Sequence, residues 1–402
     1  MKRPPLWLAA ASLACGWGAL YSIALWVFLF ARRPIHEDVR MTYVAAEAGL
    51  RYGWSTIYDP LTLQSLSEAF PAPDRAITPV LTYLNPPLLA WLFSPLTLFS
   101  EPVAYVLWTL VSLAALVFAW WLAAPYQGLA RVALLLLALA LWPVLLVFYF
   151  GQPDMLVLAL LAGTWWLLKR ERPLAAGAAL ALATFLKPQV VVLVPVVLLV
   201  SGRYRPVAGW LVGCAVLALV TVAALQGPGL TSWWQALQRG QAGGNHTEYT
   251  LAHFFGFGAL TYALWAVQGG AALAVAWRRR SQLELVLAAG ILGTTAIAFH
   301  FHELDYSLLV MAAWLFLRSS PPVWQRVFLL AGVVTTQLLT YGPQTTPPSW
   351  GDVAVHAPQL LWDAAWLVIL ALPALQGASA TSKLRPALAT TSASPRPEGR
   401  AR

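Results

Sequence analysis

Long apolar runs that repeat along the chain constrain this sequence more than any other feature. The first covers residues 6–30, and comparable runs recur up to residue 376. Apolar segments of about 18 residues or more are typical of membrane-spanning helices, and a helix makes all its backbone hydrogen bonds within the segment. With 59% hydrophobic and only 10% charged residues, the chain is too apolar for a water-soluble core. We therefore predict an all-α polytopic membrane protein.

The apolar runs predict about twelve spans and one membrane domain over residues 1–376. The expected spans cover 6–30, 103–123, 131–150, 154–169, 173–187, 189–201, 206–226, 257–277, 282–299, 305–318, 325–341 and 359–376. The two at 173–187 and 189–201 are short, so we expect a hairpin that turns at Lys187-Pro188 and need not cross completely. The first run is too long for a signal-peptide core and is interpreted as a retained anchor. Residues 377–402 are predicted to be a disordered cytoplasmic tail.

The short loops predict the orientation, because basic residues favour the cytoplasmic side of a membrane. One side of the predicted topology carries Arg131, Lys169, Arg170, Arg172, Arg203, Arg205, Arg278, Arg279, Arg280, Arg318 and Arg326. This distribution accounts for the formal net charge of +9, so we do not expect nucleic acid as a partner. The other side, where most acidic residues fall, is predicted to face the periplasm or cell exterior.

A large first external loop is expected over residues 31–102, with interfacial helices. Helical stretches are predicted at 41–52 and 61–70. The apolar stretch at 86–99 is too short for a span and fits an interfacial or re-entrant helix.

An acidic pair opens this loop, in Ile35-His36-Glu37-Asp38-Val39-Arg40. Carboxylates at this position are explained either by the start of a helix, whose dipole favours them, or by surface chemistry. In the second interpretation Asp38 is the better candidate for a general base that accepts the proton of a hydroxyl.

Lys187 is flanked by apolar residues on both sides. A lysine at membrane depth indicates a functional site, where its ammonium would pair with a phosphate. The alternative is a lysine whose amine reaches a membrane interface.

Two short polar segments between apolar runs are further candidates. Gly151-Gln152-Pro153-Asp154 is either a plain turn or a source of an amide and a carboxylate for a sugar. The segment 299–306 contains His300, His302, Glu303 and Asp305, but its H-x-H-E-x-D spacing matches no specific metal motif. A sugar or phosphate site is the favoured interpretation there, with a metal site or an ordinary polar loop as alternatives.

No cofactor site is predicted from the sequence. The two cysteines, Cys15 and Cys214, fall in predicted spans, which argues against a disulfide framework or a thiolate metal site. No phosphate-binding glycine loop or dinucleotide motif is present. If the protein transfers a sugar, a lipid-linked donor therefore fits better than a nucleotide-sugar.

Several of these segments, taken in order, resemble glycosyltransferase family 87, polytopic enzymes of the C-type glycosyltransferase fold. The matching pieces are Asp38 with Tyr43, Ala45-Ala46 and Gly49; Ile57-Tyr58-Asp59-Pro60; Tyr83-Leu84-Asn85-Pro86-Pro87 with Ser94-Pro95-Leu96; Gly151-Gln152; Lys187-Pro188; and residues 299–306. The sequence departs from the family's pattern where Leu-Asn precedes the proline pair and where Pro-Asp follows Gly-Gln.

The resemblance implies an inverting transfer of a sugar, mannose by family membership, from a polyprenyl-phosphate donor to a glycolipid or glycan acceptor. Asp38 would be the base, while Lys187, His300 and His302 would bind the donor phosphate. Substrate contacts are predicted for Glu37, Asp59, Tyr83, Asn85, Gln152, Asp154, His253, Glu303 and Asp305. No metal or cofactor is expected, and membrane lipid is a partner in the bacterial cytoplasmic membrane.

A secondary transporter or lipid flippase is the alternative from another class. Transporters often consist of two related halves, and no such internal repeat is apparent here. A convergence of Asp38, Lys187 and the 300–305 segment on one outward-facing site would favour the enzyme.

Overall fold

Helices form every regular element in the part of the chain that the structure describes. The structure, a computed structural model, describes residues 5–32, 36–69, 83–242, 249–341 and 348–372. The predicted all-α class is therefore confirmed. The predicted tail at 377–402 lies outside the described residues, and the single membrane domain over 1–376 stays a prediction.

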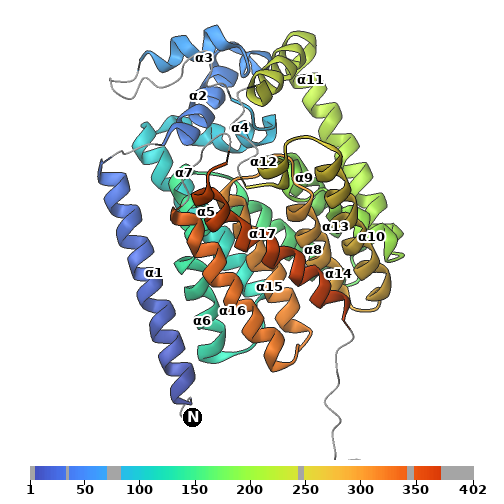
Figure 1. The fold of residues 1–402 in the computed structure, drawn as a ribbon. Helices are drawn as coiled ribbons and strands as arrows, with labels where there is room; N and C mark the ends of the chain where they lie inside the picture. Colours follow the sequence, from blue (N-terminus) through green and yellow to red (C-terminus); the bar gives the residue numbers. More distant parts are fainter. Residues whose placement is uncertain (1–4, 33–35, 70–82, 243–248, 342–347, 373–402) are drawn as a thin grey trace, which may run out of the picture. The chain divides into compact units, whose positions relative to one another are not determined.

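Figure 1 shows the helices in their sequence order. The α-helices are α1 (Leu6–Arg32), α2 (Glu37–Tyr52), α3 (Pro60–Ser67), α4 (Pro87–Phe93), α5 (Glu101–Ala123), α6 (Gly128–Ala140), α7 (Trp142–Phe150), α8 (Asp154–Lys169), α9 (Pro173–Leu186), α10 (Leu193–Val200), α11 (Tyr204–Ala242), α12 (Leu251–Phe255), α13 (Ala259–Arg278), α14 (Leu283–Ala296), α15 (Leu309–Arg318), α16 (Val323–Leu338) and α17 (Trp350–Ala371). The 3-10 helices are η1 (Trp54–Thr56), η2 (Ser94–Leu98), η3 (Pro188–Val190), η4 (Glu303–Leu308) and η5 (Leu339–Tyr341).

Several helices are long and apolar enough to cross a membrane. Among the described residues, five meet this condition by length and composition: α1, α5, α11, α13 and α17. A sixth span is possible if α6 and α7, which are bent by 60° relative to each other, count as one. The other predicted spans are shorter helices, such as α9 with 14 residues and α10 with 8. A polytopic membrane protein is thus confirmed, while the number of twelve spans stays a prediction.

The break between α6 and α7 is stabilised by a side chain from α16. The Gln337 Oε1 atom accepts a hydrogen bond from the backbone N of Trp142 at 2.6 Å, and its Nε2 donates to the Ala140 carbonyl at 3.1 Å. One amide side chain thereby satisfies two backbone groups next to the break. Backbone groups without hydrogen-bond partners are energetically unfavourable in an apolar environment, so Gln337 lowers the free-energy cost of the bend.

Basic residues gather at one end of the helix bundle. There the Lys169 Nζ atom lies 3.1 Å from Glu284, and the Arg318 Nε atom donates to the Ala123 carbonyl at 2.7 Å. The Arg279 Nε atom donates to the Leu370 carbonyl at 3.3 Å. Helix α8 connects this end to the opposite one, because it runs from Asp154 to Lys169.

The predicted first external loop contains the expected helices. Helix α2 begins four residues before the predicted stretch at 41–52, and α3 covers 60–67 where 61–70 was predicted. Figure 1 shows α2, α3 and α4 together beyond one end of the long helices, and α2 packs against α3 and α4. Helices α4 and η2 together cover residues 87–98, which at about 1.5 Å per residue is too short for a bilayer core of about 30 Å.

Two boundaries differ from the sequence-based expectation. The span predicted at 206–226 ends too early, because α11 continues to Ala242 beyond a break at Gln226, where φ is 54° and Pro228 follows. The last span was predicted from residue 359, but α17 begins at Trp350, where Ser349 and Asp352 form a capping box. Apolar periodicity placed the end of the first helix too early because the helix resumes after the break. It placed the start of the second too late because its first turn is polar and is stabilised by the capping box.

Candidate active site

Asp38 lies in the first turn of α2, where the helix dipole favours a carboxylate. Its Oδ2 atom accepts a hydrogen bond from Gln152 Nε2 at 2.7 Å. Its backbone N donates to Nδ1 of His36, the N-cap residue, at 3.3 Å. The side chain remains 29% exposed, so the carboxylate is accessible from solvent.

The turn after α7 brings Gln152 to Asp38. Gly151 ends α7 in the left-handed conformation, with φ of 64°. A Cβ atom at Gly151 would lie 2.1 Å from Cγ2 of Val39, so only glycine allows this close approach to α2. The Trp108 Nε1 atom donates to the Gly151 carbonyl at 2.8 Å and fixes the turn from the other side.

Lys187 joins three segments through buried ion pairs. Helix α9 ends just before it, and its Nζ atom lies 3.1 and 2.8 Å from the two carboxylate oxygens of Asp154. The same atom also contacts Asp305 Oδ1. Lys187 is only 4% exposed. The predicted turn at Lys187-Pro188 is present, and it places the ammonium between two carboxylates.

The segment before α15 adds histidines and a second acid to this cluster. The Asp305 Oδ2 atom accepts a hydrogen bond from the backbone N of His302 at 2.8 Å. The rings of His300 and His302 meet edge to face with centroids 4.9 Å apart, and both side chains are partly exposed. These two histidines are therefore accessible to a ligand, whereas Lys187 is enclosed.

The pKa of Glu303 is influenced by the charges of both Asp305 and Asp38. Burial raises the pKa of its carboxyl, while hydrogen bonds from its own backbone and from Tyr249 act in the opposite direction. The negative charges of Asp305 and Asp38 raise the pKa further. Asp38 is therefore electrostatically coupled to the 300–305 segment as well as bonded to Gln152.

These contacts bring most of the predicted site residues together. The Asp38–Gln152 pair and the Asp154–Lys187–Asp305 network are separated by only one residue of the chain, Pro153. We call the set Asp38, Gln152, Asp154, Lys187, His300, His302, Glu303 and Asp305 the acidic cluster. It combines an accessible carboxylate, an amide that orients it, and a rigid internal ion pair.

Other predicted residues make local contacts elsewhere. Asp59 caps α3, since its Oδ2 atom accepts from the Thr62 backbone N at 2.9 Å. Tyr83 is buried and stacks on Tyr58, whose hydroxyl donates to the Asn85 carbonyl at 2.7 Å. Substrate contacts of these residues stay predictions.

His253 and Glu37 were also predicted to contact the substrate. His253, on α12, lies with Asp352 and His356 of α17. Glu37 begins α2, and its side chain lies outside the described part of the structure. Substrate contacts of these two residues also stay predictions.

Comparison with models of known protein families shows to which family the chain belongs. The model of glycosyltransferase family 87 matches residues 83–340, which is more than half of the 402 residues. The chain belongs to glycosyltransferase family 87. Neither the curated proteins nor the solved structures that were compared give a match.

As a member of family 87, the protein is a membrane glycosyltransferase. The matched region includes Gln152, Lys187 and the 300–305 segment, whereas Asp38 precedes it. The family assignment thus rests on the part of the chain that holds most of the cluster, and Asp38 is joined to that part by its contact with Gln152.

The sequence analysis of this family 87 chain missed Tyr249. Its carbonyl accepts a hydrogen bond from the Tyr306 hydroxyl at 3.2 Å, and its side chain bonds to Glu303. Tyr249 thereby ties the segment before α12 to η4. A single tyrosine in a polar loop gives no sequence signal for such a contact.

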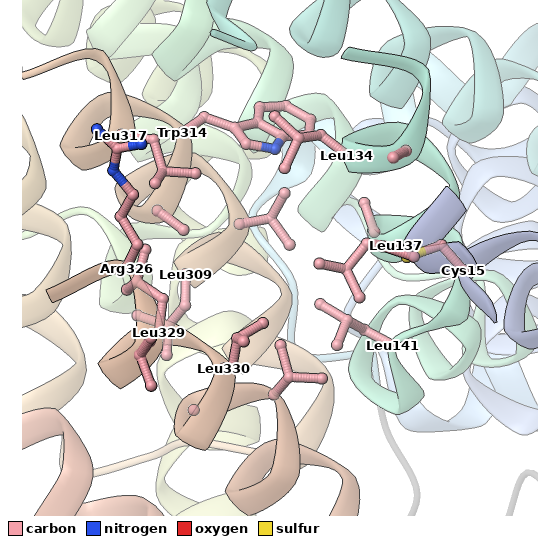
Figure 2. A pocket seen from close by; sticks show the side chains of 18 of the residues that line it. Cys15, Leu134, Leu137, Leu141, Leu309, Trp314, Leu317, Arg326, Leu329 and Leu330 are labelled. Atoms are coloured by element: carbon pink, nitrogen blue, oxygen red, sulfur yellow. The ribbon is translucent and has the colours of Figure 1, made fainter. Parts of the chain in front are cut away.

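An apolar groove of about 520 Å³ lies between α1, α6, α15, α16 and α17 (Figure 2). Figure 2 shows Leu134, Leu137 and Leu141 on one side of it and Leu309, Leu329 and Leu330 on the other. The lining includes Trp7 near the start of α1 and also Tyr306, which follows Asp305 directly in the chain. The groove therefore extends along the helices as far as the residue next to the acidic cluster.

Proposed function

We propose that this family 87 enzyme transfers a hexose, mannose, from a polyprenyl-phosphate donor to a hydroxyl group of a glycolipid or glycan. The observation that carries the proposal is the position of Asp38. Its carboxylate is accessible, is oriented by Gln152, and belongs to the same cluster as the two accessible histidines.

The proposed reaction is a single displacement that inverts the anomeric configuration. Asp38 accepts the proton of the acceptor hydroxyl, whose oxygen forms a bond to the anomeric carbon of the sugar. The bond from that carbon to the phosphate oxygen breaks, and polyprenyl phosphate leaves as an anion. Because this leaving group is already stable, orientation and charge stabilisation are able to supply much of the rate.

His300 and His302 are proposed to bind the donor phosphate, because they are the accessible donors in the cluster. Lys187 is enclosed between two carboxylates, so its charge is largely compensated within the protein. We therefore propose that Lys187 acts on the donor indirectly, as a positioning residue that fixes Asp305 and, through it, the backbone of His302.

The groove supports a lipid-linked donor. Its lining is almost entirely apolar and includes Tyr306, which follows Asp305 of the acidic cluster in the chain. We propose that the polyprenyl chain lies in the groove while its phosphate meets the histidines. The basic end of the bundle would then face the cytoplasm, and the acidic cluster would face the periplasm or cell exterior.

The first experiment tests the base. Purified protein is assayed for transfer of labelled sugar from a panel of polyprenyl-phosphate sugars to membrane acceptors, beside Asp38→Asn and the control Glu68→Gln. Glu68 is an exposed carboxylate at the end of α3. We expect transfer to fall by about 10²–10⁴-fold in Asp38→Asn only, with donor binding retained, because a positioned base contributes that much.

Equal transfer by the wild type and Asp38→Asn would remove Asp38 from the mechanism. The donor that supports transfer identifies the sugar, and activity with a different sugar alone would overturn the assignment to mannose. The configuration of the product, read by NMR, tests the inverting displacement.

A second experiment tests the groove. Ala313→Trp places a large ring among the lining residues, whereas Ala223→Trp changes an exposed position on α11. We expect Ala313→Trp to raise KM for a long-chain donor much more than for a short-chain analogue. The same KM for both donors in this variant would exclude the groove as the tail site.

A further inference from the structure

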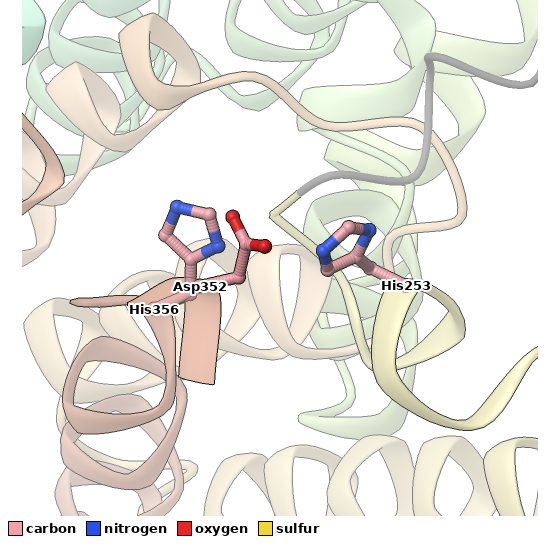
Figure 3. Close-up of side chains that lie close together, drawn as sticks. All are labelled: His253, Asp352 and His356. Atoms are coloured by element: carbon pink, nitrogen blue, oxygen red, sulfur yellow. The ribbon is translucent and has the colours of Figure 1, made fainter. Parts of the chain in front are cut away.

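A second polar cluster lies away from Asp38, between α12 and α17 (Figure 3). His253, Asp352 and His356 each offer one ligand atom, and these atoms all lie within 4.8 Å of one another. Figure 3 shows the Asp352 carboxylate between the two imidazole rings. Within the described part of the chain, this is the one group of three histidine, cysteine or acidic side chains that is close enough to share a metal ion.

The local folding of α17 explains two of the three positions. Asp352 and His356 are four residues apart, so they share one face of the helix. The Asp352 Oδ2 atom accepts hydrogen bonds from the backbone N and the hydroxyl of Ser349, which fixes the carboxylate in the first turn. His253 comes from a separate helix, so a shared ligand would bridge α12 and α17.

His356 carries the argument for a ligand. Its side chain is only 1% exposed, and among the described residues neither ring nitrogen has a hydrogen-bond partner. An imidazole contains at least one donor or acceptor at each nitrogen, and leaving such groups buried without a partner is unfavourable. Among the same residues, His253 Nε2 also has no partner. A cation held between these nitrogens and the carboxylate would give the nitrogens a partner and remove the free-energy penalty of burying them.

The three side chains indicate which kind of metal ion the site would bind. Two imidazoles and one carboxylate suit zinc and similar transition metals, and three protein ligands leave a fourth position for water. Around a tetrahedral zinc ion with bonds of about 2.0–2.2 Å, ligand atoms lie about 3.3–3.6 Å apart. In the structure the three ligand atoms lie within 4.8 Å of one another, so zinc binding would draw them closer together.

We propose that His253, Asp352 and His356 bind one zinc ion, which ties α12 to α17. The ion would also stabilise Tyr249, whose ring packs 4.6 Å from the His356 ring. Tyr249 in turn bonds to Glu303 and Tyr306, so the zinc would hold the segment that supports the acidic cluster. This proposal does not depend on the identity of the sugar donor.

The test measures zinc in the full-length protein, purified in detergent, stripped with a chelator and then titrated with Zn²⁺ against a chromophoric indicator. The wild type is compared with Asp352→Asn, His356→Phe and the double variant His300→Ala/His302→Ala. His356→Phe preserves an aromatic ring against Tyr249. We expect one zinc per chain in the wild type and in the 300/302 variant, and at least a hundredfold weaker binding in the other two.

Thermal unfolding separates loss of the site from loss of the fold. In chelator, His356→Phe should unfold at or above the wild-type temperature, because it removes buried polar groups without a metal to bind them. Addition of Zn²⁺ should raise the midpoint of the wild type and of the 300/302 variant but not that of His356→Phe, because a ligand stabilises the state that binds it. Wild-type protein that binds no zinc, or zinc that His356→Phe binds equally well, would overturn the proposal.

Discussion

The Gln152 side-chain amide donates a hydrogen bond of 2.7 Å to the carboxylate of Asp38, across 114 positions of the chain. This bond connects the first turn of α2 to the turn that precedes α8. It holds one carboxylate oxygen and leaves the side chain partly exposed. A general base needs both orientation and access, and this pair provides them together.

Removal of the orienting amide should lower turnover. We expect Gln152→Ala to reduce kcat about 10–100-fold, as is typical when a group that orients a functional side chain is lost, with KM nearly unchanged. The measurement is a steady-state assay that separates kcat from KM. A raised KM at constant kcat would instead indicate that Gln152 binds the substrate directly.

The buried ion pairs of Lys187 predict a large cost of removing its charge. Lys187→Met leaves Asp154 and Asp305 without their cation, which should destabilise the fold by about 3–5 kcal/mol. The double variant Lys187→Met/Asp154→Asn should recover part of this loss, because it removes one of the two carboxylates. Thermal unfolding of both variants checks the prediction, and a double variant no more stable than the single one would contradict it.

The KM for the donor tests whether Lys187 acts as a positioning residue. If Lys187 acts only through Asp305 and His302, the folded fraction of Lys187→Met/Asp154→Asn should show a raised KM for the donor with a smaller change in kcat. A merely structural role would lower the amount of folded enzyme and leave the KM of the folded fraction unchanged.

Gly151 should tolerate no side chain. In Gly151→Ala the new Cβ atom meets Val39 and the residue keeps a positive φ, so α2 must move away from the turn. We expect transfer to fall with the Asp38–Gln152 bond. Gly128→Ala is the matched control, because Gly128 also has a positive φ of 59° but has nothing within 4 Å of the new Cβ. Wild-type activity in Gly151→Ala, or the same loss of activity in Gly128→Ala, would contradict the prediction.

Glu303 should make stability depend on pH. Its raised pKa means that the folded state disfavours the charged form, so the stability that Glu303 contributes is complete at low pH and is lost as pH rises through the raised pKa. Glu303→Gln stays neutral, and its unfolding temperature relative to the wild type should therefore increase as the pH is raised from about 4, near the ordinary pKa of a glutamate. A difference that is constant over this range would exclude the effect.

The sequence predicted the class of fold and singled out several residues of the acidic cluster, because both inferences depend on local patterns. Apolar runs identify helices, and a carboxylate after the first run or a lysine between two apolar runs stands out against so few charges. Asp38 and Lys187 were recognisable for this reason. The family match over residues 83–340 then confirmed the predicted membership.

Contacts between distant segments were not predictable in the same way. Nothing near Lys187 indicates that its ammonium is enclosed by Asp154 and Asp305, so a phosphate was the natural expected partner. His356 was overlooked because it lies about 100 residues from His253, without a compact motif. Asp59 caps α3 through its contact with Thr62, a local role that the following Pro60 also favours, while its substrate contact stays a prediction.

The bend between α6 and α7 has a consequence for the position of the Gly151–Gln152 turn. Helix α7 carries the Gly151–Gln152 turn, and its direction relative to α6 depends on the two hydrogen bonds from Gln337. Gln337 therefore contributes to the position of the Gly151–Gln152 turn, and through Gln152 to the contact with Asp38. A residue on α16, far in sequence from Asp38 and Gln152, in this way helps to fix the geometry of that pair.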